Sequence, residues 1–395
     1  MMTIGFVRRI AVLVGILLAC VGDAPVAASQ APSPAVFTHV DSLAAAEFAR
    51  DSIASLTIGV VTEQGLLWTK SYGFGDMGSK RLADRQSVYR IGSVTKMFTG
   101  LMLHQLAANG TVRLSDPVEK YYPEIKEIRG YAKLPAPITL VQLATMTSGL
   151  AREPKQEGPF WTGPVSSWDS TLHLALPHTE MELTPGTKFQ YSNIGYAILG
   201  AALGRAAGVP YVQWQRTRIL EPLAMQHTSF EIDRAIMGNL TRGYDVSESG
   251  KFESAQADRE ALSGRGYKVP NGALYTTVDD LSRFLSLQMG HGPAQVISST
   301  RLDSAYRGTL PSGIEPGGTY GITFTTERRG PYTWFGHGGA VAGYSAGVLF
   351  DREHQVGVIV LRNALGGKVR PNAIAASVLQ HVVDAKVGGA KPAPR

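Results

Sequence analysis

Three short groups of residues in this chain have types and spacings that could support acyl-transfer chemistry. The first is Ser93-Val-Thr-Lys96, in the segment YRIGSVTKMFTG. Residues three apart in a helix lie on one face, so the hydroxyl and the amine could meet. A serine hydroxyl is a weak nucleophile until a neighbour takes its proton, and a lysine can do so only if burial or nearby positive charge lowers its pKa. The alternative is that Ser93 caps a helix and Lys96 is an ordinary surface lysine.

The second group is Tyr191-Ser-Asn193, in the segment PGTKFQYSNIGY. Pro185 and Gly186 predict a turn before it, and a helix is expected after it. The phenol of Tyr191 titrates near pH 10 when unperturbed, so it could act as a base only beside cations such as Lys96. The amide of Asn193 could bind a substrate carbonyl and orient Lys96. The alternative is a half-buried tyrosine followed by an asparagine that caps a helix.

The third group is His337-Gly338-Gly339, in YTWFGHGGAVAGYS, at the end of a predicted strand. Glycines there would let a substrate backbone lie close to the strand edge. The backbone N–H of Ala340 could complete an oxyanion hole with that of Ser93. His337 could donate to a substrate carboxylate or assist proton movement. The alternative is a loop that carries a surface histidine.

Helical apolar spacing indicates the elements that position the first two groups. It predicts a helix within 37–55, a helix over 93–109 that Ser93 caps and Gly110 ends, and interrupted helices from about 112 to 290. The interrupted helices are expected in ITLVQLATMTSGL, YSNIGYAILGAALGRAAG and TVDDLSRFLSLQM. The segments LTIGVVT and LLWTKSYG predict a β-hairpin before the helix that holds Ser93.

Strand patterns dominate the end of the chain and position the third group. TYGITFTT, YTWFGH, AGYSAGVLF and QVGVIVLR predict short strands separated by ERRGP, GGAV and DREH. A last helix is expected in NAIAASVLQHVVDA. This order predicts an α/β (α+β) fold in which both chain ends build one antiparallel sheet flanked by helices, with a mostly helical region inserted between them.

The order and surroundings of the three groups resemble the serine β-lactamase and penicillin-binding protein family, in its class C β-lactamase, DD-peptidase and esterase branch. That branch carries S-x-x-K, then Y-x-N, then K/H-x-G on a strand. The segments YRIGSVTKMFTGLMLHQLAANGTVRLSDPVEKYYPEI, ITLVQLATMTSGL, PGTKFQYSNIGYAILG, ILEPLAMQHTSF, GALYTTVDDLSRFL and HGGAVAGYSAGVLFD also resemble the family. The resemblance covers roughly residues 37 to 385 in the family's order, and implies a β-lactamase/transpeptidase-like fold.

The resemblance also implies roles for the candidate residues. Ser93 would be the nucleophile that forms an acyl-enzyme, and Tyr191 and Lys96 would share proton transfer, either being the general base. Asn193 would bind the substrate amide, and His337 would take the place of a lysine. The same tyrosine and lysine would activate water for deacylation, because no separate carboxylate base stands out in the sequence.

The third group departs from the family's K-T-G pattern. HGG lacks both the permanent positive charge and the threonine hydroxyl, which fit the carboxylate of a β-lactam, and a neutral histidine is a weaker partner. We therefore expect a serine hydrolase that cleaves a small ester or amide, as a D-alanyl-D-alanine carboxypeptidase, a D-amino peptidase or a carboxylesterase does. The alternatives are a class C-type β-lactamase and a slow-deacylating penicillin-binding sensor or scaffold. Loops at 150–170 and 245–270 would decide among substrates.

The N-terminus predicts export. Arg8 and Arg9 precede the apolar run IAVLVGILLACVG, which reads as a secretory signal over 1–28 that is cut after Ala28, or as a lipoprotein signal that ends before Cys20. We expect a leader at 29–36, the catalytic domain at 37–385 and a tail at 386–395. Within the domain, about 37–110 and 290–385 would form the sheet region, and about 111–289 the helical region. The protein would be periplasmic or extracellular, and would touch a membrane only through a lipid on that cysteine.

Composition narrows the partners of the mature protein. Without residues 1–28 the charge is 36 minus 31, or +5, and the positive charges are scattered. This argues against nucleic acid, and leaves a small-molecule or peptide substrate. The three histidines His104, His173 and His178 lack metal-ligand spacing, so we expect no metal and no cofactor. Either cut leaves no unmodified cysteine, hence no disulfide. The oligomeric state is left open.

Overall fold

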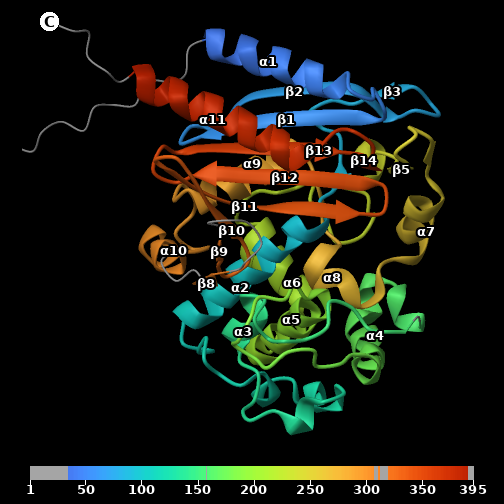
Figure 1. The fold of residues 1–395 in the computed structure, drawn as a ribbon, viewed down its shortest axis with the longest axis vertical. Coiled ribbons are helices and arrows are strands. Elements are labelled where there is room, and N and C mark those ends of the chain that lie inside the picture. Colours follow the sequence, from blue (N-terminus) through green and yellow to red (C-terminus); the bar gives the residue numbers. More distant parts are fainter. Residues whose placement is uncertain (1–33, 157, 307–309, 312–318, 390–395) are drawn as a thin grey trace, which may run out of the picture.

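The computed structural model describes residues 34–156, 158–306, 310–311 and 319–389. Within these residues, the largest element is a nine-stranded sheet whose strands come from both ends of the chain (Figure 1). The first end supplies β1 (Ser55–Thr62), β2 (Gly65–Asp76) and β3 (Arg81–Leu82). The second end supplies β8 (Leu310–Pro311), β9 (Thr319–Tyr320), β10 (Thr325–Arg329), β11 (Tyr332–Val341), β12 (Tyr344–Asp351) and β13 (Val356–Arg362). Neighbours run antiparallel in the order β3-β2-β1-β13-β12-β11-β10-β9-β8, which confirms the predicted fold class.

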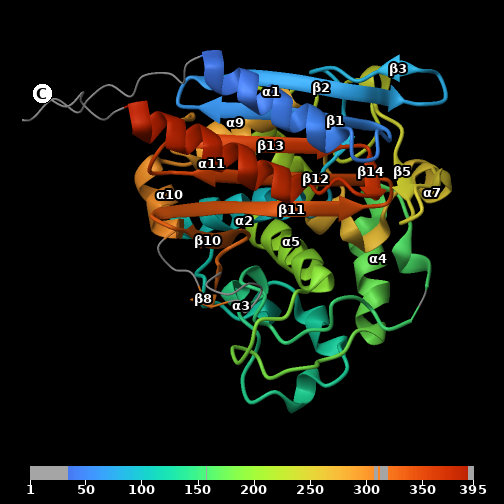
Figure 2. The same ribbon diagram turned by 45° about the horizontal axis from the view of Figure 1, so that its top comes forward.

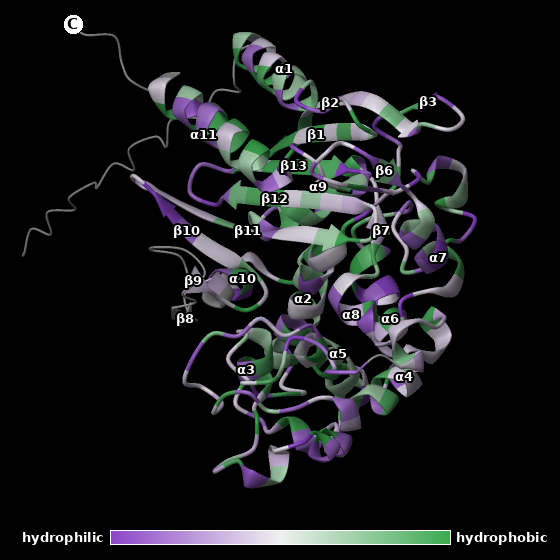
Figure 3. Cartoon of the chain, turned by 45° about the vertical axis from the view of Figure 1, so that its right-hand side comes forward, coloured by the Kyte–Doolittle hydropathy of each residue, from purple (hydrophilic) through white to green (hydrophobic). Residues whose placement is uncertain are grey.

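The middle of the sheet is apolar on both faces because helices cover both of its sides. Every residue of β1 and β13 is buried, and both strands are largely hydrophobic in Figure 3. On one face, α1 (Pro34–Phe48) and α11 (Pro371–Gly389) lie side by side across the strands (Figures 1 and 2). Their apolar side chains join those of the strands in one buried cluster. On the other face, α9 (Val278–Gln288) lies against β1 and β13.

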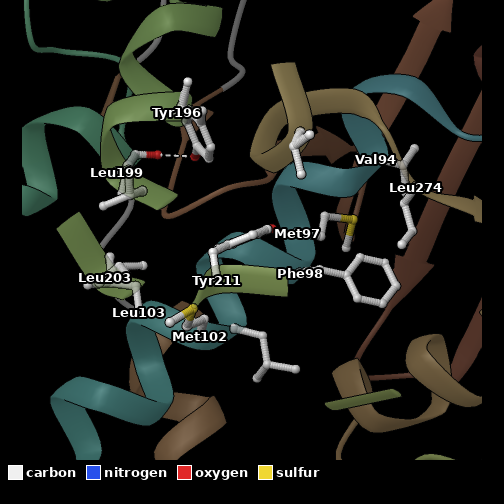
Figure 4. Close-up of a cluster of buried hydrophobic side chains, with 14 of the residues drawn as sticks. Val94, Met97, Phe98, Met102, Leu103, Tyr196, Leu199, Leu203, Tyr211 and Leu274 are labelled. Carbon is white, nitrogen blue, oxygen red and sulfur yellow. Dashed lines mark hydrogen bonds between the residues drawn. The ribbon is translucent and has the colours of Figure 1, made fainter. Parts of the chain in front are cut away.

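Helix α2 (Thr95–Ala108), which follows the first candidate group, packs against α5 (Asn193–Ala207) of the helical region. Met97, Phe98 and Met102 of α2 belong to one apolar cluster with Leu199 and Leu203 of α5 (Figure 4). The first nine residues of α2 are all buried, as is typical of a helix with packing on every side. This central position brings the first group of candidate residues to the boundary between the sheet and the helical region.

The remaining elements are short and lie mostly in the inserted region. The helices are α3 (Leu140–Ala144), α4 (Trp168–Ala175), α6 (Tyr211–Gln215), α7 (Ala255–Ser263), α8 (Val269–Gly272) and α10 (Ser299–Tyr306). Two small sheets are formed by β4 (Tyr89–Arg90) with β7 (Tyr275–Thr276), and by β14 (Ala364–Gly366), β5 (Tyr244–Val246) and β6 (Phe252–Glu253). None of the helices in the described ranges combines the length and the apolar character that crossing a membrane requires.

Several boundaries differ from those that the sequence indicates. Helix α1 begins within the expected leader, and α11 continues past 385 to Gly389. The segment GGAV does not end a strand: β11 runs through Gly338 and Gly339, which pair with Gly347 and Ala346 of β12. Backbone pairing needs no side chain, so two glycines are tolerated in this ladder. The predicted signal and the cysteine of the lipoprotein alternative lie outside the described residues.

Candidate active site

Ser93 lies in a single 3₁₀ turn, Gly92–Val94, that leads into α2 and stands directly against β11. A Cβ on Gly92, whose φ is +50°, would lie 2.8 Å from the backbone nitrogen of Ala340. A Cβ on Gly339 would lie 2.0 Å from the carbonyl oxygen of Ile91. Glycine at both positions therefore lets the two backbones approach more closely than side chains would allow. This contact places the turn that holds Ser93 and the backbone of Ala340 at one edge of the site.

The prediction that Ser93 caps the following helix is wrong. Helix α2 begins at Thr95, so Val94 holds the N-cap position, and no side chain caps it. The 3₁₀ turn moves the helix start two residues beyond Ser93. The side chain of Ser93 is therefore free of a capping role, and its Oγ lies 3.1 Å from Lys96 Nζ.

Lys96 is fully buried, with a relative exposure of 0%, so it is not a surface lysine. Its Nζ lies 2.8 Å from Asn193 Oδ1 and 2.9 Å from the carbonyl oxygen of Asn271, in addition to Ser93 Oγ. Asn193 opens α5 and Asn271 belongs to α8, so three separate segments meet at this amine. Asn271 Nδ2 also donates to the backbone oxygen of Asn193, which ties α8 to the start of α5.

Burial lowers the pKa of Lys96 well below its ordinary value. Removing an ammonium group from water disfavours its charged form, and the nearby positive charges of Arg265, Arg152 and Lys268 act in the same direction. The carboxylate of Glu153 opposes the shift. The lowered pKa favours the neutral amine, which is the form of a lysine that can accept a proton.

Tyr191 faces the same amine from the segment just before α5. Lys96 Nζ lies 4.9 Å from the centroid of its ring, and Arg152 Cζ lies 4.8 Å from that centroid. Burial raises the pKa of Tyr191 to about 12, while its hydrogen bond with Ser93 and the charge of Arg152 oppose the rise. The side chain is therefore a neutral phenol near pH 7, placed to exchange a proton with Ser93.

The amide of Asn193 is held in one orientation by partners on both of its ends. Its oxygen accepts from Lys96, and its Nδ2 donates to Glu153 Oε1 at 2.7 Å. Glu153 also accepts a hydrogen bond from the hydroxyl of Tyr267 through its second oxygen. Asn193 does not cap α5, because Ser192 holds that position and its Oγ accepts from the backbone N–H of Gly195 at 3.0 Å.

His337 is buried, with a relative exposure of 5%, so the alternative of a surface histidine in a loop is wrong. Burial lowers its pKa to about 3. In the neutral ring, Nδ1 donates to the backbone oxygen of Gly338 at 2.5 Å, because a carbonyl can only accept. Nε2 then accepts from the hydroxyl of Tyr320 at 3.0 Å. Its ring centroid lies 6.3 Å from that of Tyr191.

The neighbouring residues of β11 face opposite sides of the sheet, as residues of a strand do. Gly339 faces the turn that holds Ser93. A Cβ on Gly338 would instead meet Asn372 Nδ2 of α11 at 2.4 Å, on the other face. The structure thus brings Ser93, Lys96, Tyr191 and Asn193 together and places His337, Gly339 and Ala340 beside them. Gly338 can reach this site only through its backbone.

Sequence reasoning missed three residues that contact the predicted ones: Glu153, Asn271 and Tyr320. Each is a single polar residue with no spacing signal, and each becomes a neighbour only through folding. In the described part of the chain, no group of three or more His, Cys, Asp or Glu side chains is placed to hold a metal ion.

Comparisons with known proteins show which proteins the chain is similar to. The chain is 27% identical over 344 residues to Beta-lactamase-like protein 4 of Dictyostelium discoideum, which covers 82% of this chain and 58% of that protein. It is 25% identical over 325 residues to Protein flp of Staphylococcus aureus (strain NCTC 8325 / PS 47), covering 82% and 62%. The chain therefore spans about three fifths of the length of these curated relatives.

The solved structure of the octameric penicillin-binding protein homologue from Pyrococcus abyssi has the same fold, with a TM-score of 0.72 and 23% identity. That match covers 89% of this chain and 77% of the other. The family model described as Beta-lactamase matches residues 40–382. The chain therefore belongs to the Beta-lactamase family, whose fold is that of the serine β-lactamases and penicillin-binding proteins.

Proposed function

We propose that this protein is a serine hydrolase that cleaves a small ester or amide through an acyl-enzyme on Ser93. The observation that carries the proposal is the buried amine of Lys96, 3.1 Å from Ser93 Oγ. A buried lysine without a negative partner in contact is unfavourable for stability, and such groups gather at functional sites. Membership of the Beta-lactamase family supports the same reaction class.

The contacts of Lys96 favour it as the general base. A neutral amine has two N–H bonds and one lone pair. The carbonyl oxygens of Asn193 and Asn271, at 2.8 and 2.9 Å, can only accept, so they take the two N–H bonds. The lone pair is left for the third neighbour, the hydroxyl of Ser93. Tyr191, whose pKa is raised to about 12, suits the role of proton donor.

The reaction follows from these assignments. Lys96 takes the proton of Ser93 as Oγ bonds to the substrate carbonyl carbon, and the carbonyl oxygen takes the negative charge. The backbone N–H groups of Ser93 and Ala340 would stabilise that oxyanion. Tyr191 then gives its proton to the leaving alcohol or amine and regains one from the Lys96 ammonium, as the C–O or C–N bond breaks. Water repeats these steps on the acyl-enzyme, which releases the acid and restores Ser93.

The neutral state of His337 favours esters and neutral amides as substrates. Its pKa of about 3 leaves no positive charge on β11 at neutral pH, and both ring nitrogens already have protein partners. A carboxylate would find no charged partner on this strand. We therefore place carboxylesterase-like or D-amino peptidase-like cleavage first.

One observation favours a second candidate, the cleavage of a carboxylate-bearing substrate such as a D-alanyl peptide or a β-lactam. The guanidinium of Arg152 is exposed and stands over the ring of Tyr191. The permanent positive charge of Arg152 could bind the carboxylate of a substrate, for which β11 has no charged partner. Replacing Arg152 by Gln should raise KM for benzylpenicillin and for a D-alanyl-D-alanine peptide, and leave KM for p-nitrophenyl acetate unchanged. The matched control is Arg129→Gln, another exposed arginine, which pairs with Glu180.

The proposed function is tested by following p-nitrophenyl acetate turnover and the intact mass of the protein together. We expect repeated turnover in the wild type, and neither turnover nor an acetyl adduct in Ser93→Ala. The exposed Ser249→Ala serves as the matched control. A single burst with a lasting adduct would instead support the slow-deacylating alternative, and benzylpenicillin in the same assay tests for a β-lactamase. Full activity in Ser93→Ala would overturn the proposal.

We also infer that residues 1–28 direct export to the periplasm or the medium. The basic pair Arg8 and Arg9 and the apolar run after it support this inference. Intact mass of the protein recovered from its native host separates two outcomes: a chain that starts at Ser29, or a lipidated chain that starts at Cys20. A retained Met1 would contradict both.

A further inference from the structure

A polar cavity lies near the candidate active site, but none of the residues proposed to react lines it. Its volume is about 190 Å³, enough for several water molecules or one small ion. Its lining comes from β4, α7, β7 and the loop before α4, and includes Arg90, Glu260, Arg265 and Tyr275. Ser93, Lys96 and Tyr191 are not among the residues that line it.

Arg90 is the unusual residue of this cavity. It is 1% exposed, and its Nη2 donates to Glu260 Oε2 at 2.9 Å. Its Nε and Nη1 are buried and have no hydrogen-bond partner in the described part of the chain. Its guanidinium carbon lies 5.4 Å from the centroid of the Tyr275 ring, which supports one face of the group but accepts no conventional hydrogen bond. Buried donors without acceptors are destabilising, so an acceptor that reached them would stabilise the protein.

Among the charged side chains that line the cavity and are not exposed, two guanidinium groups stand beside one carboxylate. Arg265 stands beside Arg90, and its Nε lies 3.1 Å from the same Glu260 oxygen. Its Nη1 donates to the backbone oxygen of Gly272 at 2.7 Å. One carboxylate is therefore shared by two guanidinium groups. The second carboxylate in the lining, that of Glu231, belongs to an exposed residue.

From this geometry we propose that the cavity is a binding site for a small oxyanion, that is, a carboxylate or phosphate group. Arg90 Nε and Nη1 are covered in this structure, so the anion's oxygens accept from them once its entry displaces the atoms that cover them. Its negative charge is attracted by the two guanidinium groups of Arg90 and Arg265. Access runs past the exposed residues Leu262 and Ser263, which lie at the end of α7 and line the same cavity. The cavity is distinct from the proposed hydrolase site, because Ser93, Lys96 and Tyr191 do not line it.

Isothermal titration calorimetry on the full mature chain tests the proposal. Inorganic phosphate and acetate are titrated separately at low ionic strength, and sodium chloride at matched ionic strength controls for screening. We expect one saturable site for at least one of the two oxyanions, and none for chloride. Binding of acetate alone would assign the site to a carboxylate group, and binding of phosphate alone to a phosphate group.

Two variants locate the binding. Arg90→Gln should weaken the binding at least tenfold because it removes the charge and the two unpartnered donors. Ser263→Glu adds a negative charge at the rim without touching the core, so it should weaken binding even if Arg90→Gln fails to fold. The matched control is Ser249→Glu, an exposed serine that does not line the cavity, which should bind as the wild type does.

Three results would overturn the proposal. The first is the absence of binding for both oxyanions. The second is undiminished binding in Ser263→Glu. The third is binding that disappears when Ser93 is blocked by a fluorophosphonate but persists in Ser263→Glu, because that pattern would place the anion in the hydrolase site.

Discussion

Replacing Gly339 by alanine should separate the turn that holds Ser93, the proposed nucleophile, from strand β11. An added Cβ would lie 2.0 Å from the backbone oxygen of Ile91, whereas carbon and oxygen in contact keep about 3.3 Å. The two backbones must then move apart by about 1.3 Å, because neither atom is the end of a flexible side chain. The movement would increase the distance between the backbone N–H groups of Ser93 and Ala340, which are proposed to bind the oxyanion.

The size of the effect follows from that displacement. Misplacing reacting groups by about 1 Å can lower a rate about 100-fold. Overpacking of this kind lowers the free energy of unfolding by about 1–3 kcal/mol. We therefore expect kcat/KM for p-nitrophenyl acetate to fall about 100-fold in a protein that stays folded at 25 °C. Ester turnover gives the rate, and urea unfolding gives the stability.

The neighbouring Gly338 provides the comparison because its added Cβ would point to the other face. There it would meet the end of the Asn372 side chain at 2.4 Å, which can move. Gly338→Ala should therefore lose much less activity, and adding Asn372→Ala should restore the stability that it loses. An undiminished rate in Gly339→Ala would refute the reasoning, and so would equal losses in the two glycine variants.

Three further variants test the proton-transfer groups. Lys96→Met should lower kcat about 1,000-fold. Lys96 binds a proton more weakly in the folded chain than in the unfolded chain. The free energy of unfolding of the wild type should therefore rise with pH between the lowered pKa and 10.5. Urea unfolding of Lys96→Met at several pH values should show a smaller rise, because the variant lacks this group. Tyr191→Phe should slow acylation about 100-fold without loss of thermal stability, and near-normal rates in a stable variant would remove Tyr191 from the mechanism. The pKa of His337 is about 3 when folded and about 6.5 when unfolded, so the wild type should lose stability as pH falls from 6.5 towards 3, and His337→Gln should lose less.

Local pattern was enough to predict most of the sheet. The apolar runs LTIGVVT and QVGVIVLR became β1 and β13, because strands covered on both faces need apolar residues at every position. The residue pattern gave wrong boundaries where backbone hydrogen bonding, and not side-chain type, determines the structure. Gly338 and Gly339 indicate a break by composition, yet the ladder with β12 continues through them. Likewise, the 3₁₀ turn at Ser93 moved the start of α2, since a serine that suits an N-cap also suits a tight turn.

The candidate site also contains residues that could be predicted from the sequence and residues that could not. Ser93, Lys96 and Tyr191 carry a recognisable spacing and order, so the sequence could single them out. The residues that position these three side chains have no recognisable spacing in the sequence. Asn271 contributes a backbone carbonyl, which any residue could offer, and Glu153 lies in a loop whose position depends on the whole helical region.

Glu153, which the sequence did not indicate, acts on the pKa of Lys96 in the direction opposite to burial. Burial and three nearby cations push its pKa down, whereas Glu153 pushes it up while also fixing the Asn193 amide. Without the carboxylate, the Asn193 amide could turn its donor end towards the amine, and the lone pair would no longer be directed at Ser93. Without the burial, the amine would stay charged and could not accept a proton. The proposed base therefore needs both effects at once: the burial that lowers its pKa, and the Glu153 carboxylate that holds the Asn193 amide in place.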